Sequence, residues 1–119
     1  MNDKPGDLKQ RTKDFSLRII QMYCALPKST EAQVLGKQIL RSGTSVGAHY
    51  REAVRARSNA EFISKLEGGL QELEETGYWL ELLGESGVAD PDKLSGLRDD
   101  TRELNAMLTA SVKTVKSRK

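Results

Sequence analysis

The stretch that decides the fold is LSGLRDDTRELNAMLTASVKTV, residues 94–115. Apolar and small side chains recur in it at alternating intervals of three and four residues, which is the repeat of a helix that packs against other helices along one seam. Asp90 and Pro91 precede the stretch as an N-cap and a first-turn proline, so we predict a helix over residues 91–116. The predicted seam consists of Leu94, Leu97, Thr101, Leu104, Leu108, Ser111 and Val115.

Three earlier stretches have the same helical periodicity and predict helices at residues 7–26, 30–57 and 59–84. Pro27 marks the end of the first helix, and Ser29 or Thr30 is the expected N-cap of the second. Ser58 and Glu61 have capping-box spacing at the start of the third. Helices of this length with short connections predict an all-α, antiparallel up-down four-helix bundle, formed by residues 1–119 as a single domain.

Composition limits the class of protein. The chain has 119 residues, of which 37% are hydrophobic and 30% charged, enough for one core. A single cysteine excludes an internal disulfide. The chain has no run of about 20 apolar residues and no apolar stretch near its start, so we expect neither a membrane span nor a signal peptide. The expected location is the cytoplasm.

Charge is segregated along the chain, although the net charge is only +2. Residues 1–57 have a net charge of +6, residues 58–112 of −8 and residues 113–119 of +4. Such asymmetry indicates a basic and an acidic surface. Two interpretations stay open: attraction between oppositely charged helices of one bundle, or a functional basic face.

The second predicted helix carries its cations on the face opposite its core stripe. Four of them extend over about 27 Å of helix, a length that matches several phosphate spacings of a nucleic-acid strand. A solvated helix face is the alternative interpretation. The predicted nucleic-acid-binding residues are Lys37, Arg41, Arg51, Arg55 and Arg57, with Lys113, Lys116, Arg118 and Lys119 as further cations.

Two features predict contact between subunits. Glycines at positions 36, 43 and 47 fall on one flank of the second helix, where each costs about 1 kcal/mol relative to alanine. Close approach of a neighbouring helix, from the same bundle or from another subunit, would compensate for this cost. In the third helix, apolar residues outside the core stripe indicate an interaction patch, or a wide buried arc. The predicted interface residues are Tyr78, Trp79, Leu82, Gly43 and Gly47, beside an acidic strip of Glu67, Glu74, Glu81 and Glu85.

Catalytic patterns are weak. The chain has one histidine, His49, and one cysteine, Cys24, and sequence alone shows no contact between a nucleophile and a base. We expect His49 to be a partly buried or surface residue and Cys24 to be a small buried side chain. No catalytic residue, metal site or cofactor is predicted.

Six blocks of the sequence together resemble the 23S rRNA intervening-sequence protein family. The blocks are LRSGTSVGA (40–48), EA (52–53), ARS (56–58), EFISKL (61–66), ELEET (72–76) and YWLELL (78–83). The resemblance implies an all-helical bacterial bundle that assembles as a homopentamer, without established enzymatic activity. The family is similar to the accessory protein of diversity-generating retroelements, a basic pentamer that binds nucleic acid and a reverse transcriptase. The family often has Ala where Gly43 stands and Asn where His49 stands.

These observations predict a non-enzymatic oligomer that binds the backbone of RNA or DNA through a basic helix face. The alternative is a ring that acts as a protein-interaction scaffold, with a protein partner and without nucleic acid. A small bundle enzyme, such as an RNase, is the weakest interpretation because no convincing acid–base pair is present.

Overall fold

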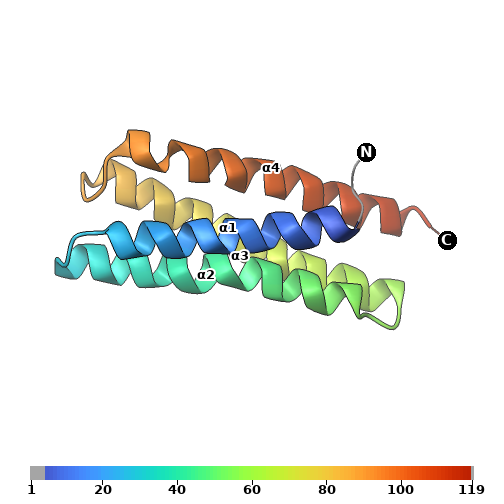
Figure 1. Ribbon diagram of the computed structural model, residues 1–119. Helices are drawn as coiled ribbons and strands as arrows, with labels where there is room; N and C mark the ends of the chain where they lie inside the picture. The colour runs from blue at the N-terminus through green and yellow to red at the C-terminus, as the bar shows by residue number, and fades with distance from the viewer. Residues whose placement is uncertain (1–4, 119) are drawn as a thin grey trace.

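Four helices follow one another in the computed structural model, which describes residues 5–118 (Figure 1). They are α1 (Pro5–Ala25), α2 (Thr30–Val54), α3 (Asn59–Glu85) and α4 (Pro91–Lys116). Each helix runs antiparallel to the one before it, in a body of 50 × 23 × 20 Å. The prediction of an all-α up-down four-helix bundle is confirmed. Helix α2 ends at Val54, three residues before its predicted end at 57, because Arg55 is its C-cap.

Side-chain caps fix three of the helix starts, as the sequence predicts. The hydroxyl of Ser29 accepts from the backbone N–H of Ala32, and Asp90 accepts from Asp92. Ser58 accepts from the backbone N–H of Glu61 at 3.1 Å. The Glu61 carboxylate accepts from the N–H of Arg57, one residue before the cap, at 3.1 Å. This contact ties the α2–α3 turn to the first turn of α3.

The seam of α4 is buried as predicted from Leu94 to Leu108 and again at Val115, but not at Ser111. Val112 is buried, whereas Ser111 is only partly buried, so the assignment of Ser111 to the seam is wrong. A straight helix drifts about 20° per heptad against a repeat of 3.5 residues. After two heptads the valine therefore faces the core and the serine moves to the edge.

Glycines on α2 allow α1 to lie close against it. A Cβ at Gly43 would lie 2.9 Å from Cγ1 of Ile19, and one at Gly47 would lie 3.3 Å from Oγ1 of Thr12. Both glycines are buried under α1 of the same chain. This corrects their assignment to a subunit interface: the helix that approaches them belongs to the same bundle.

Candidate nucleic-acid interface

The outer face of α2 carries the four cations predicted from the sequence, which we call the basic stripe: Lys37, Arg41, Arg51 and Arg55. Lys37, Arg51 and Arg55 are exposed on it, while Ile39 and Val46 on the opposite side are fully buried. Helix geometry separates Lys37 from Arg55 by about 27 Å along the axis. Helix α2 therefore presents a straight row of cations on a face that the core leaves in solvent.

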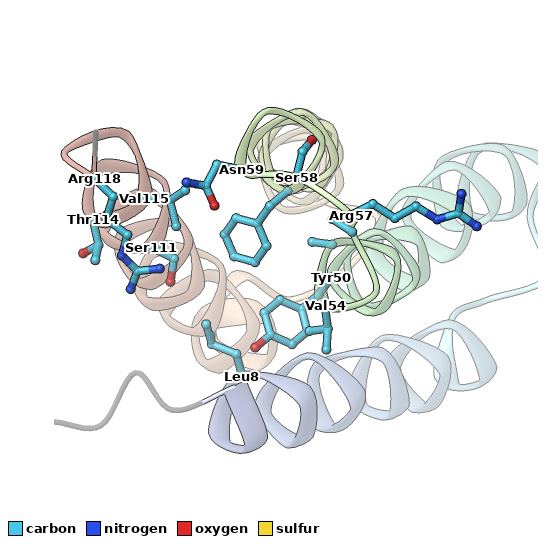
Figure 2. Close-up of a pocket in the computed structure, with 13 residues that line it drawn as sticks. Leu8, Tyr50, Val54, Arg57, Ser58, Asn59, Ser111, Thr114, Val115 and Arg118 are labelled. Carbon is cyan, nitrogen blue, oxygen red and sulfur yellow. The ribbon is translucent and has the colours of Figure 1, made fainter.

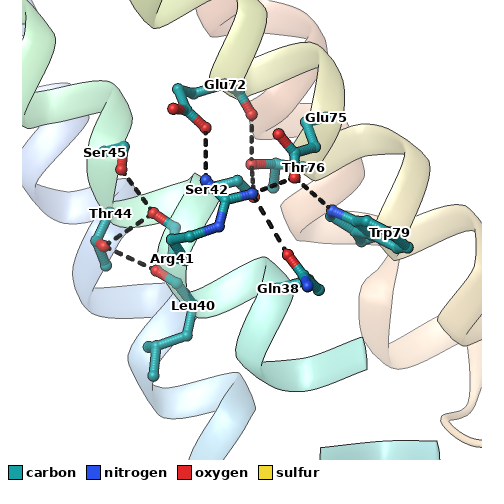
Figure 3. A network of polar contacts seen from close by, with 10 residues as sticks. All are labelled: Gln38, Leu40, Arg41, Ser42, Thr44, Ser45, Glu72, Glu75, Thr76 and Trp79. Atoms are coloured by element: carbon teal, nitrogen blue, oxygen red, sulfur yellow. Dashed lines mark hydrogen bonds and ion pairs between the residues drawn. The ribbon is translucent and has the colours of Figure 1, made fainter. Parts of the chain in front are cut away.

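Arg41 differs from the rest of the stripe because its guanidinium is held against α3 (Figure 3). Its Nη1 lies 3.2 Å from a carboxylate oxygen of Glu72, and its Nη2 contacts Glu75. Glu75 also accepts from the indole N–H of Trp79 at 2.9 Å. The charge of Arg41 is thus neutralised by two carboxylates, although its side chain is half-exposed.

The remaining cations of the stripe are unpaired. Within residues 5–118, Lys37, Arg51, Arg55 and Arg57 make no ion pair. The nearby carboxylate of Glu52 instead lies 3.4 Å from Nζ of Lys65. These four cations can therefore meet phosphate groups without first breaking an internal ion pair.

Lys9 of α1 joins the stripe, which the sequence interpretation missed. A depression of about 80 Å³ is lined by Lys9, Arg51, Val54 and Arg55. The antiparallel order places the first turns of α1 beside the last turns of α2 (Figure 1). The sequence shows a lysine near the start of α1, but only the antiparallel topology places it beside Arg51 and Arg55.

The C-terminal cations divide into two groups. Arg118 lines the wall of a larger pocket whose lining also includes Arg57. Lys116 lies 3.4 Å from a carboxylate oxygen of Glu67, and Lys113 is exposed on α4. Lys119 lies outside the described residues. Of this group, Arg118 is the residue that the fold brings to the basic end of α2.

Positive charge concentrates at the end of the bundle that contains the α2–α3 turn. The helix halves nearest this turn, residues 5–16, 46–70 and 103–118, carry ten Lys and Arg against six Asp and Glu. The other halves, residues 17–45 and 71–102, carry seven against ten. The segregation seen along the chain thus becomes a charge gradient along the bundle, which steers an anion towards the turn.

The predicted interface patch on α3 is only partly exposed. Tyr78 is 53% exposed, and its ring centroid lies 5.2 Å from that of Trp79. Trp79 packs against the core and Leu82 is partly buried. In the adjacent acidic strip, Glu74, Glu81 and Glu85 are exposed and make no ion pair within residues 5–118, whereas Glu67 pairs with Lys116.

The single histidine and the single cysteine lie in different places. His49 lies between α2 and α3, where a Cβ at Gly68 would be 3.1 Å from its ring. Its buried Nδ1 has no hydrogen-bond partner among the described residues, and Glu52 is 3.6 Å away. Cys24 is exposed on α1, so the expectation that it is buried is wrong. The exposed position follows from the α1 periodicity, in which Met22 and Leu26 face the bundle.

Residues 5–118 contain no group of three or more His, Cys, Asp or Glu side chains placed to hold a metal ion. In the same range, no helix combines the length and the apolarity that crossing a bilayer requires.

Comparison with known proteins places this arrangement in a family. Residues 6–110 match the family model described as 23S rRNA-intervening sequence protein. The chain belongs to this family. The chain is also similar to a solved structure from Bacteroides thetaiotaomicron, described as a protein with unknown function from the S23 ribosomal protein family. That structure is 40% identical, has a TM-score of 0.86, and the match covers 92% of this chain and 98% of the other. No curated protein sequence matches the chain.

Proposed function

We propose that this 23S rRNA-intervening sequence protein is a non-enzymatic homo-oligomer that binds the phosphate backbone of RNA or DNA. The phosphate contacts are Lys37, Arg51, Arg55 and Arg57 on and beside α2. The observation that carries the proposal is that these four cations are exposed and unpaired. Phosphate contacts position a strand without reading its bases, so binding has little sequence preference.

A homopentamer, the assembly that the family resemblance implies, would repeat the stripe five times. Several weak sites on one particle raise the overall affinity because the later contacts become intramolecular. Tyr78, Trp79 and Leu82 are the proposed subunit contacts, with the acidic strip of α3 facing basic residues of a neighbour. A mass of five times the 13.2 kDa subunit in native mass spectrometry tests this part.

Fluorescence anisotropy with an internally labelled structured RNA and a DNA duplex tests the binding. The measurement is made at about 50 and 200 mM salt, because released counterions make affinity fall steeply as salt rises. The variant replaces Lys37, Arg51 and Arg55 with Gln. Its affinity should be much weaker, and its salt slope should be flatter by about 2 to 3 because each lost phosphate contact removes about 0.7–0.9.

A charge-matched control replaces Lys93, Arg98 and Arg102 of α4 with Gln. These residues lie on α4, which packs against α1 and α3 rather than against α2 and carries no residue of the stripe, so their loss should leave the salt slope unchanged. Equal effects of the two triple variants would show that binding follows net charge alone, and the stripe would then lose its assigned role.

The second candidate function is a protein-interaction scaffold. The exposed Tyr78 beside Glu74 and Glu81 favours it, because an aromatic residue within unpaired carboxylates suits a basic protein partner. Absence of RNA and DNA binding at low salt would favour the scaffold over the nucleic-acid function.

A further inference from the structure

A pocket of about 470 Å³, which we call the end pocket, opens at the basic end of the bundle (Figure 2). All four helices contribute to it. Tyr50 and Val54 come from α2, Phe62 from α3, Ser111 from α4 and Leu8 from α1. Its volume is in the range of pockets that hold small organic ligands.

The lining combines aromatic surface, hydrogen-bonding groups and positive charge. Phe62 supplies a partly exposed ring and Tyr50 one that is only 3% exposed, while Asn59, Ser111 and Thr114 supply an amide and two hydroxyls. Within the described chain the only charged residues that line the pocket are Arg57 and Arg118, and no carboxylate does. A ligand that fits this set has a flat ring with polar edges and an attached anion.

The two arginines lie on different sides of the opening. Arg118 lies along α4 beside Ser111, whereas Arg57 extends from the opposite rim over α2 (Figure 2). Guanidinium groups bind phosphate through paired hydrogen bonds. One phosphate can therefore sit under Arg118, whereas the guanidinium of Arg57 points over α2 and away from the opening.

The end pocket is continuous with the basic stripe. Val54 lines both the end pocket and the depression formed by Lys9, Arg51 and Arg55. A strand bound along α2 would therefore reach the pocket at the end of the helix. A fatty acid fits less well, because its tail would make no use of the amide and hydroxyls of the wall.

We infer that the end pocket binds a nucleoside monophosphate unit, with the base against the partly exposed ring of Phe62 and the phosphate on Arg118. This inference rests on the proposed function, because the preferred source of the nucleoside monophosphate unit is the terminal nucleotide of a strand bound along the stripe. A free nucleotide has the same chemistry and is the other source.

Titration with AMP, followed by amide NMR shifts, tests the pocket directly. Shifts should cluster at Phe62, Ser111 and Thr114. Ser111→Trp fills the pocket and should weaken AMP binding at least tenfold, whereas Ser95→Trp, at an exposed site of the same helix, should leave it unchanged. Arg118→Ala should also weaken it, and Arg102→Ala, which removes the same charge at an exposed site, should not.

Linear and circular single-stranded RNAs of the same sequence, about 12 nucleotides long, separate the two sources. If the pocket takes a strand end, the linear RNA binds about fivefold or more tightly than the circle, and Ser111→Trp abolishes the difference. Equal binding of both RNAs together with clustered AMP shifts would assign the pocket to free nucleotide.

The end-pocket inference and the proposed function can fail separately, and the measurements distinguish the two failures. RNA binding by the wild type without AMP shifts at the pocket, and unaltered by Ser111→Trp, overturns the end pocket and leaves the stripe. AMP binding at the pocket without RNA binding overturns the proposed function and leaves the pocket.

Discussion

The guanidinium of Arg41 contacts the carboxylate of Glu75, so a cation of the basic stripe is paired across the α2–α3 contact (Figure 3). Glu72 accepts a second hydrogen bond from it at 3.2 Å. The row of unpaired cations along α2 is therefore interrupted between Lys37 and Arg51. The main role of Arg41 is to hold α2 against α3.

We expect Arg41→Ala to lower the free energy of unfolding by about 1 kcal/mol or less, because the ion pair is half-exposed. RNA affinity should change less than for Arg51→Ala, since Arg41 has little free charge to offer. Urea unfolding and anisotropy titration of both variants measure the two effects. A larger loss of RNA affinity in Arg41→Ala than in Arg51→Ala would contradict the assignment.

The hydroxyls of Ser42 and Thr76 form a buried hydrogen bond of 2.7 Å between α2 and α3. Thr76 donates its own proton to the carbonyl of Glu72, so Ser42 is the donor in this bond. Thr76→Val keeps the shape and removes the acceptor. We expect it to cost about 1–3 kcal/mol of unfolding free energy, the penalty for an unsatisfied buried hydroxyl.

Adding Ser42→Ala to Thr76→Val should recover part of this loss, because no buried hydroxyl then lacks a partner. A double-mutant cycle by urea unfolding measures the coupling. Strictly additive losses would show that the two hydroxyls do not depend on each other.

Alanine should have opposite effects at two glycines, Gly43 in the contact of α1 with α2 and Gly77 on α3 opposite α4. Gly43→Ala should destabilise the protein by about 1–3 kcal/mol, because the new Cβ would lie 2.9 Å from Ile19 inside a packed core. Gly77→Ala is the control: its Cβ would be 3.7 Å from Thr101, an ordinary contact. It should stabilise α3 by up to about 1 kcal/mol. Thermal unfolding measures both, and stabilisation by Gly43→Ala would show that α1 yields at this point.

Much of this fold could be predicted from the sequence, because helix signals are local. Ser58 with Glu61, and Asp90 with Pro91, mark helix starts within a few residues of chain. The alternation of three and four residues identifies the core of α4 up to Leu108. The position of Ser111 could not be predicted by extending that repeat, because a straight helix does not hold a period of 3.5.

The candidate site was harder to predict because its members come from different helices. A helical wheel places Lys37, Arg41 and Arg51 on one face of α2 and carries no information about α3. Pairing of Arg41 with Glu72 depends on the register between two helices. The placement of Lys9 beside Arg55, and of Arg118 and Arg57 around one pocket, likewise depends on the antiparallel topology.

The exposed Tyr78 gives a prediction for the proposed oligomer. Tyr78→Asp removes the apolar ring from the proposed contact and would bury a carboxylate in its place, which costs desolvation energy. Subunit association should weaken strongly, while the monomer keeps its helicity because the residue is 53% exposed. Native mass spectrometry measures the assembly and circular dichroism the fold. Asn105→Asp, an equal change of charge at an exposed site of α4, is the control. An unchanged assembly would remove Tyr78 from the interface.

Tyr50 gives a prediction for the dependence of stability on pH. Burial raises the pKa of its hydroxyl above the ordinary value of 10.0, so the folded protein keeps this proton when the unfolded chain has already lost it. The contribution of Tyr50 to stability is therefore complete below about pH 10 and declines as the pH rises further. Urea unfolding at a series of alkaline pH values measures the decline. In Tyr50→Phe, which has no phenol to ionise at this position, the decline should be smaller than in the wild type. Tyr78→Phe, which retains Tyr50, should behave like the wild type. An identical alkaline decline in Tyr50→Phe and the wild type would show that ionisation of Tyr50 does not limit folding at high pH.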